Sequence, residues 1–169
     1  MAISLPDAAT DAGAETRVLL AEVPMPSAAG YTLALAKTAM QYMDAVLWNR
    51  TKKPTAYGAK RGAGLVDIIK APGQFAGFQN YPSYSASIIK RIQEAMDITN
   101  AAKDKRSAAY ADHINAAIER ANASEVDDPS PGDLTGWRTA GHGSPGSGFT
   151  AYQTVLGNTF YWVPYVERK

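Results

Sequence analysis

A single glutamate, Glu22, has the position in this chain that best suits acid–base chemistry. Asp11 is expected to cap a short helix that ends at about Glu22, just before Pro24 and Pro26. The helix dipole disfavours a carboxylate at that end, and an apolar site would raise its pKa further. A glutamate with a raised pKa can protonate a glycosidic oxygen at neutral pH. The alternative is a surface glutamate at a fraying helix end.

Side chains that suit sugar binding follow in later segments of the chain. Amides donate and accept hydrogen bonds with hydroxyl and N-acetyl groups, and an aromatic face stacks on a pyranose ring. Packing in the core remains the alternative for Phe75 and Tyr161, and a turn-rich loop is the alternative for residues 128–137. The candidate binding residues are Asn49, Gln74, Phe75, Thr135, Trp137, Asn158 and Tyr161.

The order of these motifs resembles the SleB-type cell-wall hydrolase family, whose members cut bacterial peptidoglycan. Ala21-Glu22 is similar to the family's Ala-Glu pair, which precedes a helix ending in Leu-Asn-Arg; here that end is Leu47-Trp48-Asn49-Arg50. Residues 72–75, 128–137 and 157–161 are similar to the family's Pro-x-Gln-Phe-Ser, Asp-Pro-Thr-x-Gly-Ala-aromatic and Gly-Asn-His-x-Phe-Tyr motifs. The family's second glutamate is missing, because Pro24-Met25-Pro26-Ser27 stands in its place.

The resemblance implies a lysozyme-like or lytic-transglycosylase-like helical domain that cleaves the bond between N-acetylmuramic acid and N-acetylglucosamine. Most glycosidases use two carboxylates, but one suffices when the substrate's own hydroxyl attacks the anomeric carbon. We therefore expect a lytic transglycosylase in which Glu22 acts as acid and then as base. A hydrolytic muramidase or phage endolysin, an amidase, and a non-catalytic protein of the cell wall or a secretion apparatus are the alternatives. Four acids without a motif are possible partners for Glu22: Asp44, Asp67, Asp128 and Asp133.

Composition argues against several other classes of protein. The formal net charge is +1, from 17 Lys and Arg against 16 Asp and Glu, so strong nucleic-acid binding is not expected. The chain has no cysteine, and His113 and His142 have no zinc-ligand spacing, so neither a metal nor another cofactor is expected. No apolar run reaches the roughly 20 residues of a membrane span.

The N-terminus lacks the basic start and apolar stretch of a Sec signal. We therefore expect a domain that acts on the periplasmic cell wall after another route of export, such as injection by a type VI secretion system or delivery by a phage. An injected antibacterial effector implies a cognate periplasmic immunity protein. A truncated chain explains the missing signal equally well.

Periodicity predicts a mainly helical (α+β) fold with a small β element, in a single domain over residues 1–169. The three-and-four spacing of apolar residues, together with capping residues and prolines, sets the helix limits. The expected elements are an irregular lead-in at 1–10, helices at 11–22, about 28–51, 65–69 and from Ser85 or Ser87 to about 121 with a break near 103–107, an ordered loop at 74–84 with a possible short strand, a long loop at 123–149, and one or two strands within 152–166.

Overall fold

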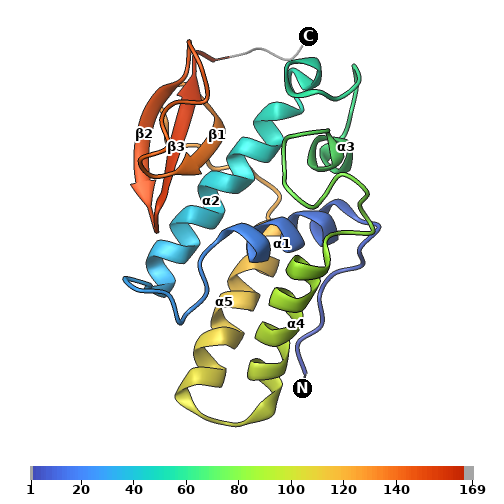
Figure 1. Ribbon diagram of the computed structural model, residues 1–169, viewed down its shortest axis with the longest axis vertical. Helices are drawn as coiled ribbons and strands as arrows, with labels where there is room; N and C mark the ends of the chain where they lie inside the picture. Colours follow the sequence, from blue (N-terminus) through green and yellow to red (C-terminus); the bar gives the residue numbers. More distant parts are fainter. Residues whose placement is uncertain (1, 166–169) are drawn as a thin grey trace.

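Helix α2 (Leu33–Arg50) lies at the centre of the fold, with a small sheet on one side and the remaining helices on the other (Figure 1). The computed structural model describes residues 2–165. This part of the chain is predominantly helical with a small antiparallel sheet, which confirms the expected class. Its other elements are α1 (Asp11–Glu22), the 3-10 helix η1 (Pro54–Tyr57), α3 (Leu65–Lys70), α4 (Ala86–Ala101), α5 (Lys105–Ala121), β1 (Asp133–Thr139), β2 (Thr150–Val155) and β3 (Asn158–Val163).

A capping side chain sets the start of helix α1, and a proline sets its end. The Thr10 side chain accepts a hydrogen bond from the Gly13 amide at 3.0 Å, so Thr10 is the N-cap in place of the predicted Asp11, which is the first helical residue. Val23 takes an extended conformation before Pro24, as a residue before proline prefers. Glu22 is therefore the last residue of α1, as predicted.

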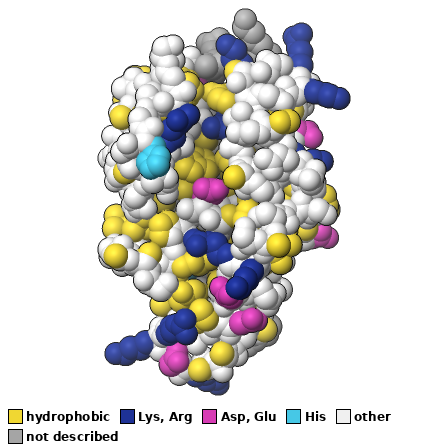
Figure 2. Space-filling view, viewed as in Figure 1, with side chains coloured by type: hydrophobic (Ala, Val, Ile, Leu, Met, Phe, Trp, Pro, Cys, Tyr) yellow, Lys and Arg dark blue, Asp and Glu magenta, His cyan; other side chains and the backbone are white. Residues whose placement is uncertain are grey.

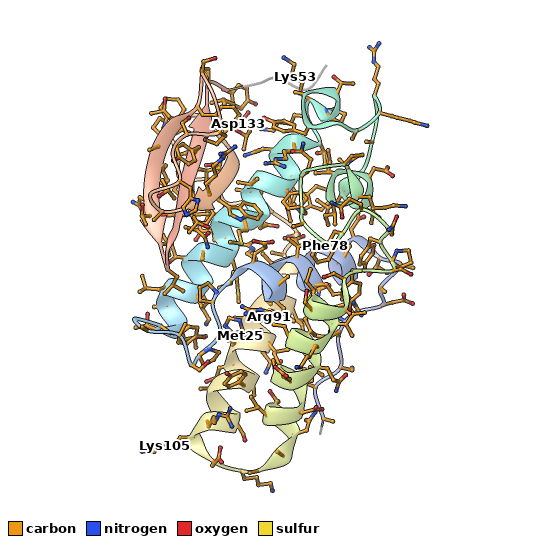
Figure 3. All side chains as sticks on the ribbon, viewed as in Figure 1. Met25, Lys53, Phe78, Arg91, Lys105 and Asp133 are labelled. Carbon is orange, nitrogen blue, oxygen red and sulfur yellow. The ribbon has the colours of Figure 1, made fainter. Side chains whose placement is uncertain are left out.

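The end of α1 is held by a side chain of α4. Arg91 Nε donates to the Leu20 carbonyl at 3.1 Å, and Arg91 Nη2 donates to the Val23 carbonyl at 2.9 Å. The last carbonyls of a helix have no hydrogen-bond partner within the helix, and Arg91 supplies donors to two of the carbonyls at this terminus. Figure 3 shows Arg91 beside the C-terminal end of α1. The backbone around Glu22 is thus fixed from outside its own helix.

Helix α2 starts later than the predicted residue 28, which corrects that limit. Gly30 has a φ of 75°, which interrupts a right-handed helix, and the Thr32 hydroxyl accepts from the Leu35 amide at 3.1 Å. Thr32 is therefore the N-cap in place of Ser27. The end of the helix at Arg50 lies one residue before the predicted limit.

The core has two parts that meet at α1 and α2. One contains Leu19, Met40, Met43 and Val46, packed against α5 and the inner face of the sheet. The other contains Leu47, α3 and the loop after it, whose side chains Phe75, Phe78 and Tyr81 are buried. Burying each such side chain contributes roughly 1.5–3 kcal/mol. Residues 71–85, between α3 and α4, are therefore ordered by packing, although they contain no strand.

The sheet has the order β1-β3-β2, with antiparallel pairs. The turn between β2 and β3 has positive φ at Leu156 and Gly157, the conformation favoured in two-residue hairpins. Trp137 pairs with Phe160 and Thr139 pairs with Asn158. One or two strands were predicted within residues 152–166, and the structure has two, β2 and β3; β2 begins at Thr150, slightly before the predicted limit, and Val166 lies outside the described residues.

Strand β1 lies inside the segment 123–149 that was predicted to be a loop, so that expectation is wrong for Asp133–Thr139. The strand carries a glycine, Gly136, and a register shift between Leu134 and Gly136 breaks the alternation of inward and outward residues. Its hydrogen-bond partner, β3, is about twenty residues away in sequence. A strand of this kind has little local signal and is stabilised by pairing.

Helices α4 and α5 form a hairpin that extends away from the sheet (Figure 1). Ser85 is the N-cap of α4 and Asp104 is the N-cap of α5, so the break predicted near residues 103–107 is confirmed. Lys105, at the start of α5, marks the far end of this hairpin in Figure 3. None of the helices between residues 2 and 165 is both long and apolar enough to cross a membrane.

Candidate active site

Five of the eight residues predicted for the site line one pocket of about 260 Å³. The pocket lies where the ends of α1 and α2 meet the loop after α3 and the strands β1 and β3. Figure 2 shows a hollow on this face of the molecule, with an acidic side chain in it and apolar and basic side chains around it. The lining residues are Glu22, Arg50, Gln74, Phe75, Ala76, Trp137, Arg138, Thr139 and Asn158.

Glu22 is the one carboxylate among these lining residues. Its burial raises its pKa above the ordinary value, while the Trp137 side chain and the positive charge of Arg91 act in the opposite direction. The loss of hydration on burial disfavours the charged form of a carboxyl group. Glu22 therefore combines partial access to the pocket with a tendency to hold its proton, as a general acid requires.

Aromatic rings form one wall of the pocket. The Phe75 and Trp137 ring centroids are 5.5 Å apart with planes tilted by 40°, and Trp137 also contacts Phe160. Phe75 is only 4% exposed and belongs to the second part of the core, whereas Trp137 is partly exposed. Phe75 therefore supports the wall, and Trp137 offers the surface on which a sugar ring can stack.

Polar groups line the rest of the pocket. Gln74 Oε1 accepts a hydrogen bond from Arg50 Nη1 at 3.1 Å, which leaves the Gln74 amide nitrogen as a donor for a ligand. Asn158 and Thr139 are paired across β1 and β3 and contribute an amide and a hydroxyl. The arrangement offers both donors and acceptors around one carboxyl group whose pKa is raised.

Arg50, the last residue of α2, was not among the predicted site residues. Arg50 Nε donates to the Thr135 carbonyl at 2.9 Å, and the guanidinium lies between two aromatic rings, 4.7 Å from the Tyr57 centroid and 5.1 Å from that of Phe75. Burial lowers its pKa to about 10. The Leu-Trp-Asn-Arg segment contains Arg50, but the sequence did not show that Arg50 lines the pocket, because the residues that it contacts there are far away in sequence.

Three predicted binding residues lie outside this pocket, which corrects their assignment to it. Asn49 is buried, and its Nδ2 donates to Asp128 Oδ2 at 2.8 Å and to the Leu134 carbonyl at 2.9 Å. Thr135 is buried beneath the β1 irregularity, and its hydroxyl makes no hydrogen bond within residues 2–165. Tyr161 is 8% exposed, and its hydroxyl donates to the Gly143 carbonyl at 3.1 Å.

None of the four acids considered as partners for Glu22 lines its pocket. Asp133 pairs with Lys52 at 2.8 Å, and Asp128 accepts from Asn49 and from the amides of Ser130 and Leu134. Asp67 accepts from the Gly64 amide at the start of α3. Asp44 is buried between α2 and α5, where Arg120 Nε lies 3.5 Å from its Oδ2. Each of these carboxylates therefore has a role in holding the fold.

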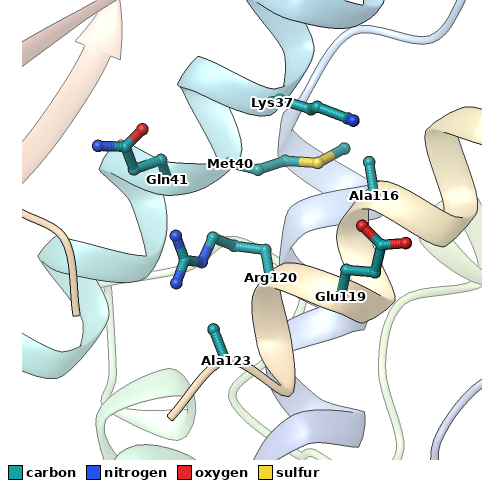
Figure 4. A pocket seen from close by; sticks show the side chains of 7 residues that line it. All are labelled: Lys37, Met40, Gln41, Ala116, Glu119, Arg120 and Ala123. Atoms are coloured by element: carbon teal, nitrogen blue, oxygen red, sulfur yellow. The ribbon is translucent and has the colours of Figure 1, made fainter. Parts of the chain in front are cut away.

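A second pocket of about 320 Å³ lies between α2 and α5 (Figure 4). Its base includes Met40 and Ala116, and Lys37 and Glu119 lie at its edge. Glu119 is exposed, whereas Glu22 is partly buried. This pocket therefore lacks the feature that makes Glu22 a candidate for acid catalysis.

No family model, curated protein or solved structure matches the chain. The resemblance to the SleB-type family thus stays a prediction from the sequence. Among residues 2–165, no group of three or more His, Cys, Asp or Glu side chains could hold a metal ion.

Proposed function

We propose that this chain is a peptidoglycan glycosidase that cleaves the bond between N-acetylmuramic acid and N-acetylglucosamine as a lytic transglycosylase. The observation that carries the proposal is the pocket in which Glu22 is the single carboxylate, partly buried and beside Trp137, Gln74 and Asn158. The aromatic and amide groups suit an N-acetylated sugar, and the raised pKa suits proton donation.

A single carboxylate favours transglycosylation over hydrolysis. In the proposed reaction the protonated Glu22 donates its proton to the leaving O4 of N-acetylglucosamine as the C1–O4 bond breaks. The O6 hydroxyl of the muramic acid attacks C1 and gives its proton to the Glu22 carboxylate. No water is consumed, and the acid is regenerated. An inverting hydrolase would need a second carboxylate to activate water, roughly 6.5–9.5 Å from the first.

Purified sacculi provide the test of this reaction. The wild-type protein should release fragments with anhydro ends, identified by mass spectrometry, and Glu22→Gln should lower the rate by about 10²–10⁴-fold. Glu119→Gln, which changes an exposed acid at the second pocket, is the matched control and should retain full activity. Reducing ends in place of anhydro ends would reject transglycosylation, and a fully active E22Q protein would reject the site.

The proposed substrate makes the periplasm the expected site of action. Directing the chain to the periplasm of a Gram-negative host with an added signal peptide should lyse the cells, whereas expression in the cytoplasm should not. The Glu22→Gln protein should be harmless in both compartments. A cognate inhibitor protein that covers the pocket is the partner this proposal calls for, and its co-expression in the periplasm should restore growth. Equal survival with wild-type and E22Q protein in the periplasm would argue against the proposal.

A further inference from the structure

Arg50, which lines the pocket, forms no ion pair with an acidic side chain in the described part of the chain. The ion pairs between residues 2 and 165 join Lys52 to Asp133, Lys90 to Glu94 and Arg120 to Asp44, so Arg50 takes part in none of them. Its relative exposure is 9%. A buried cation without a counter-charge is costly, because its hydration is lost and no charge replaces it.

Neutral contacts compensate only part of that cost. Arg50 lies at the C-terminus of α2, where the helix dipole favours a cation, and two oxygens and two rings surround the guanidinium. Its Nε and Nη1 are used in these bonds, whereas Nη2 has no hydrogen-bond partner within the described part of the chain. The guanidinium thus retains hydrogen-bonding capacity beside the pocket that it lines.

The charges that line the pocket also favour an anionic ligand. Its charged lining residues are Glu22, Arg50 and Arg138. When Glu22 holds its proton, as the proposed reaction requires, two arginines remain and no carboxylate opposes them. Such a pocket attracts an anionic ligand group, and arginine in particular suits a carboxylate, which it can bind through two N–H groups.

We propose that Arg50 binds a carboxylate that the glycan carries next to the cleaved bond. This inference rests on the proposed function and narrows its substrate. Two sources supply such a group: the lactyl carboxylate of muramic acid, which is free only after the stem peptide has been removed, and a carboxylate of the stem peptide itself. In the first case an amide-hydrolysing reaction must precede this enzyme, because the peptide is attached to the lactyl group through an amide bond.

Binding to the wild-type protein tests the first source, the lactyl carboxylate, without any variant. The probes are the disaccharide N-acetylglucosaminyl-N-acetylmuramic acid and the same disaccharide with its lactyl acid converted to the primary amide. NMR titration should show at least about tenfold tighter binding of the acid, a difference that decreases as salt is raised. Equal binding of the two probes, together with an absence of any preference between the sacculi described next, would overturn the inference.

Sacculi with and without stem peptides separate the two sources. If the lactyl carboxylate is bound, amidase-stripped sacculi should be cleaved at least about tenfold faster than intact ones, and a stem-peptide carboxylate should give the opposite order. Arg50→Gln should abolish either preference, and Arg50→Lys should keep part of it, because it keeps the charge but loses the planar fork. Lys53→Gln, which removes an exposed cation one turn further along the chain, is the matched control and should change nothing.

The outcomes distinguish a failure of this inference from a failure of the proposed function. Glu22-dependent cleavage at equal rates on both sacculi, unchanged in R50Q, overturns the role of Arg50 and leaves the glycosidase proposal standing. Absence of cleavage by the wild-type protein rejects the glycosidase, while tighter binding of the acid probe still supports carboxylate recognition by Arg50. Circular dichroism and thermal unfolding of R50Q show whether a lost preference comes from lost folding.

Discussion

At the scale of single residues, a second buried acid accompanies Glu22 on α1. Glu15 lies two turns before Glu22, is completely buried and faces Asp44 of α2. Burial raises the pKa of Glu15 to about 10, and the neighbouring carboxyl group of Asp44 contributes to this increase. Two ionised carboxylates in this buried position could only repel each other, so Glu15 keeps its proton. Arg120 provides the balancing charge at 3.5 Å from Asp44.

This pair predicts how stability depends on pH. Below the ordinary pKa of 4.5, Glu15 is protonated in both the folded and the unfolded state, so folding carries no penalty from it. Above that pH the unfolded chain loses the proton while the folded chain keeps it, so the free energy of unfolding falls by up to about 1.4 kcal/mol per pH unit. Glu15→Gln keeps the size of the side chain and removes the titration. Its gain in Tm over the wild type should therefore grow between about pH 5 and pH 8.

Glu119→Gln on α5 is the control for this measurement, because it removes an exposed acid of the same type. Its Tm should follow the wild type at every pH. A Glu15→Gln protein that loses stability relative to the wild type as the pH rises would contradict the protonated pair.

At the scale of elements, the junction of α1 and α4 fixes the acid. Arg91 binds the carbonyls on both sides of Glu22, at Leu20 and Val23, and its charge lowers the pKa of Glu22 against the larger effect of burial. The same side chain therefore positions the acid and tunes its proton affinity. A helix terminus with its carbonyls satisfied in this way has less freedom to fray.

Arg91→Gln should shift the pH profile of the proposed reaction. Without the positive charge, the pKa of Glu22 rises further, so the alkaline limb of kcat/KM, where Glu22 loses its proton, should move to higher pH. Lys90→Gln is the control, since Lys90 is exposed on the same helix and pairs with Glu94. Rate measurements on sacculi across pH give the comparison. A limb that stays in place or moves to lower pH would show that Arg91 does not act on Glu22.

At the scale of the whole molecule, the site exists only because the sheet is attached to α2. Asn49 is one of the polar links between them, and its amide reaches both Asp128 and the Leu134 carbonyl at the start of β1. Trp137 and Asn158, which line the pocket, lie on the sheet that this link holds. Asn49 therefore supports the site indirectly, although it does not line the pocket.

Asn49→Ala should weaken stability and activity together. Removing the amide leaves the buried Leu134 carbonyl without this donor and the partly buried Asp128 carboxylate with one donor fewer, which costs about 1–3 kcal/mol and lowers Tm by roughly 2–4 °C per kcal/mol. Gln41→Ala, which loses an exposed 3.3 Å bond from the same helix to the Asp127 carbonyl, should cost about 0.5 kcal/mol or less. Thermal unfolding and kcat/KM check both effects. Equal losses of stability in the two variants would show that the buried hydrogen bonds of Asn49 contribute no more than the exposed bond of Gln41.

Local signals in the sequence determined most of the helices. The ends of α1 at Glu22 and of α2 at Arg50 follow from Pro24 and from the apolar spacing before Pro54, and the break between α4 and α5 was visible from the polar residues near Asp104. The late start of α2 was missed because Gly30 takes a left-handed conformation that composition alone did not reveal.

Tertiary structure alone decided which side chains share the pocket. The position of Glu22 and its raised pKa could be predicted from a helix end beside prolines, but the meeting of Trp137, Arg50 and Gln74 required β1 to pair with β3 and to pack on α2. Helix periods and caps are set by residues within a turn or two of one another, so they can be predicted from the sequence. Strand pairing and the desolvation of charges depend on groups brought together from across the chain, and only the folded molecule specifies them.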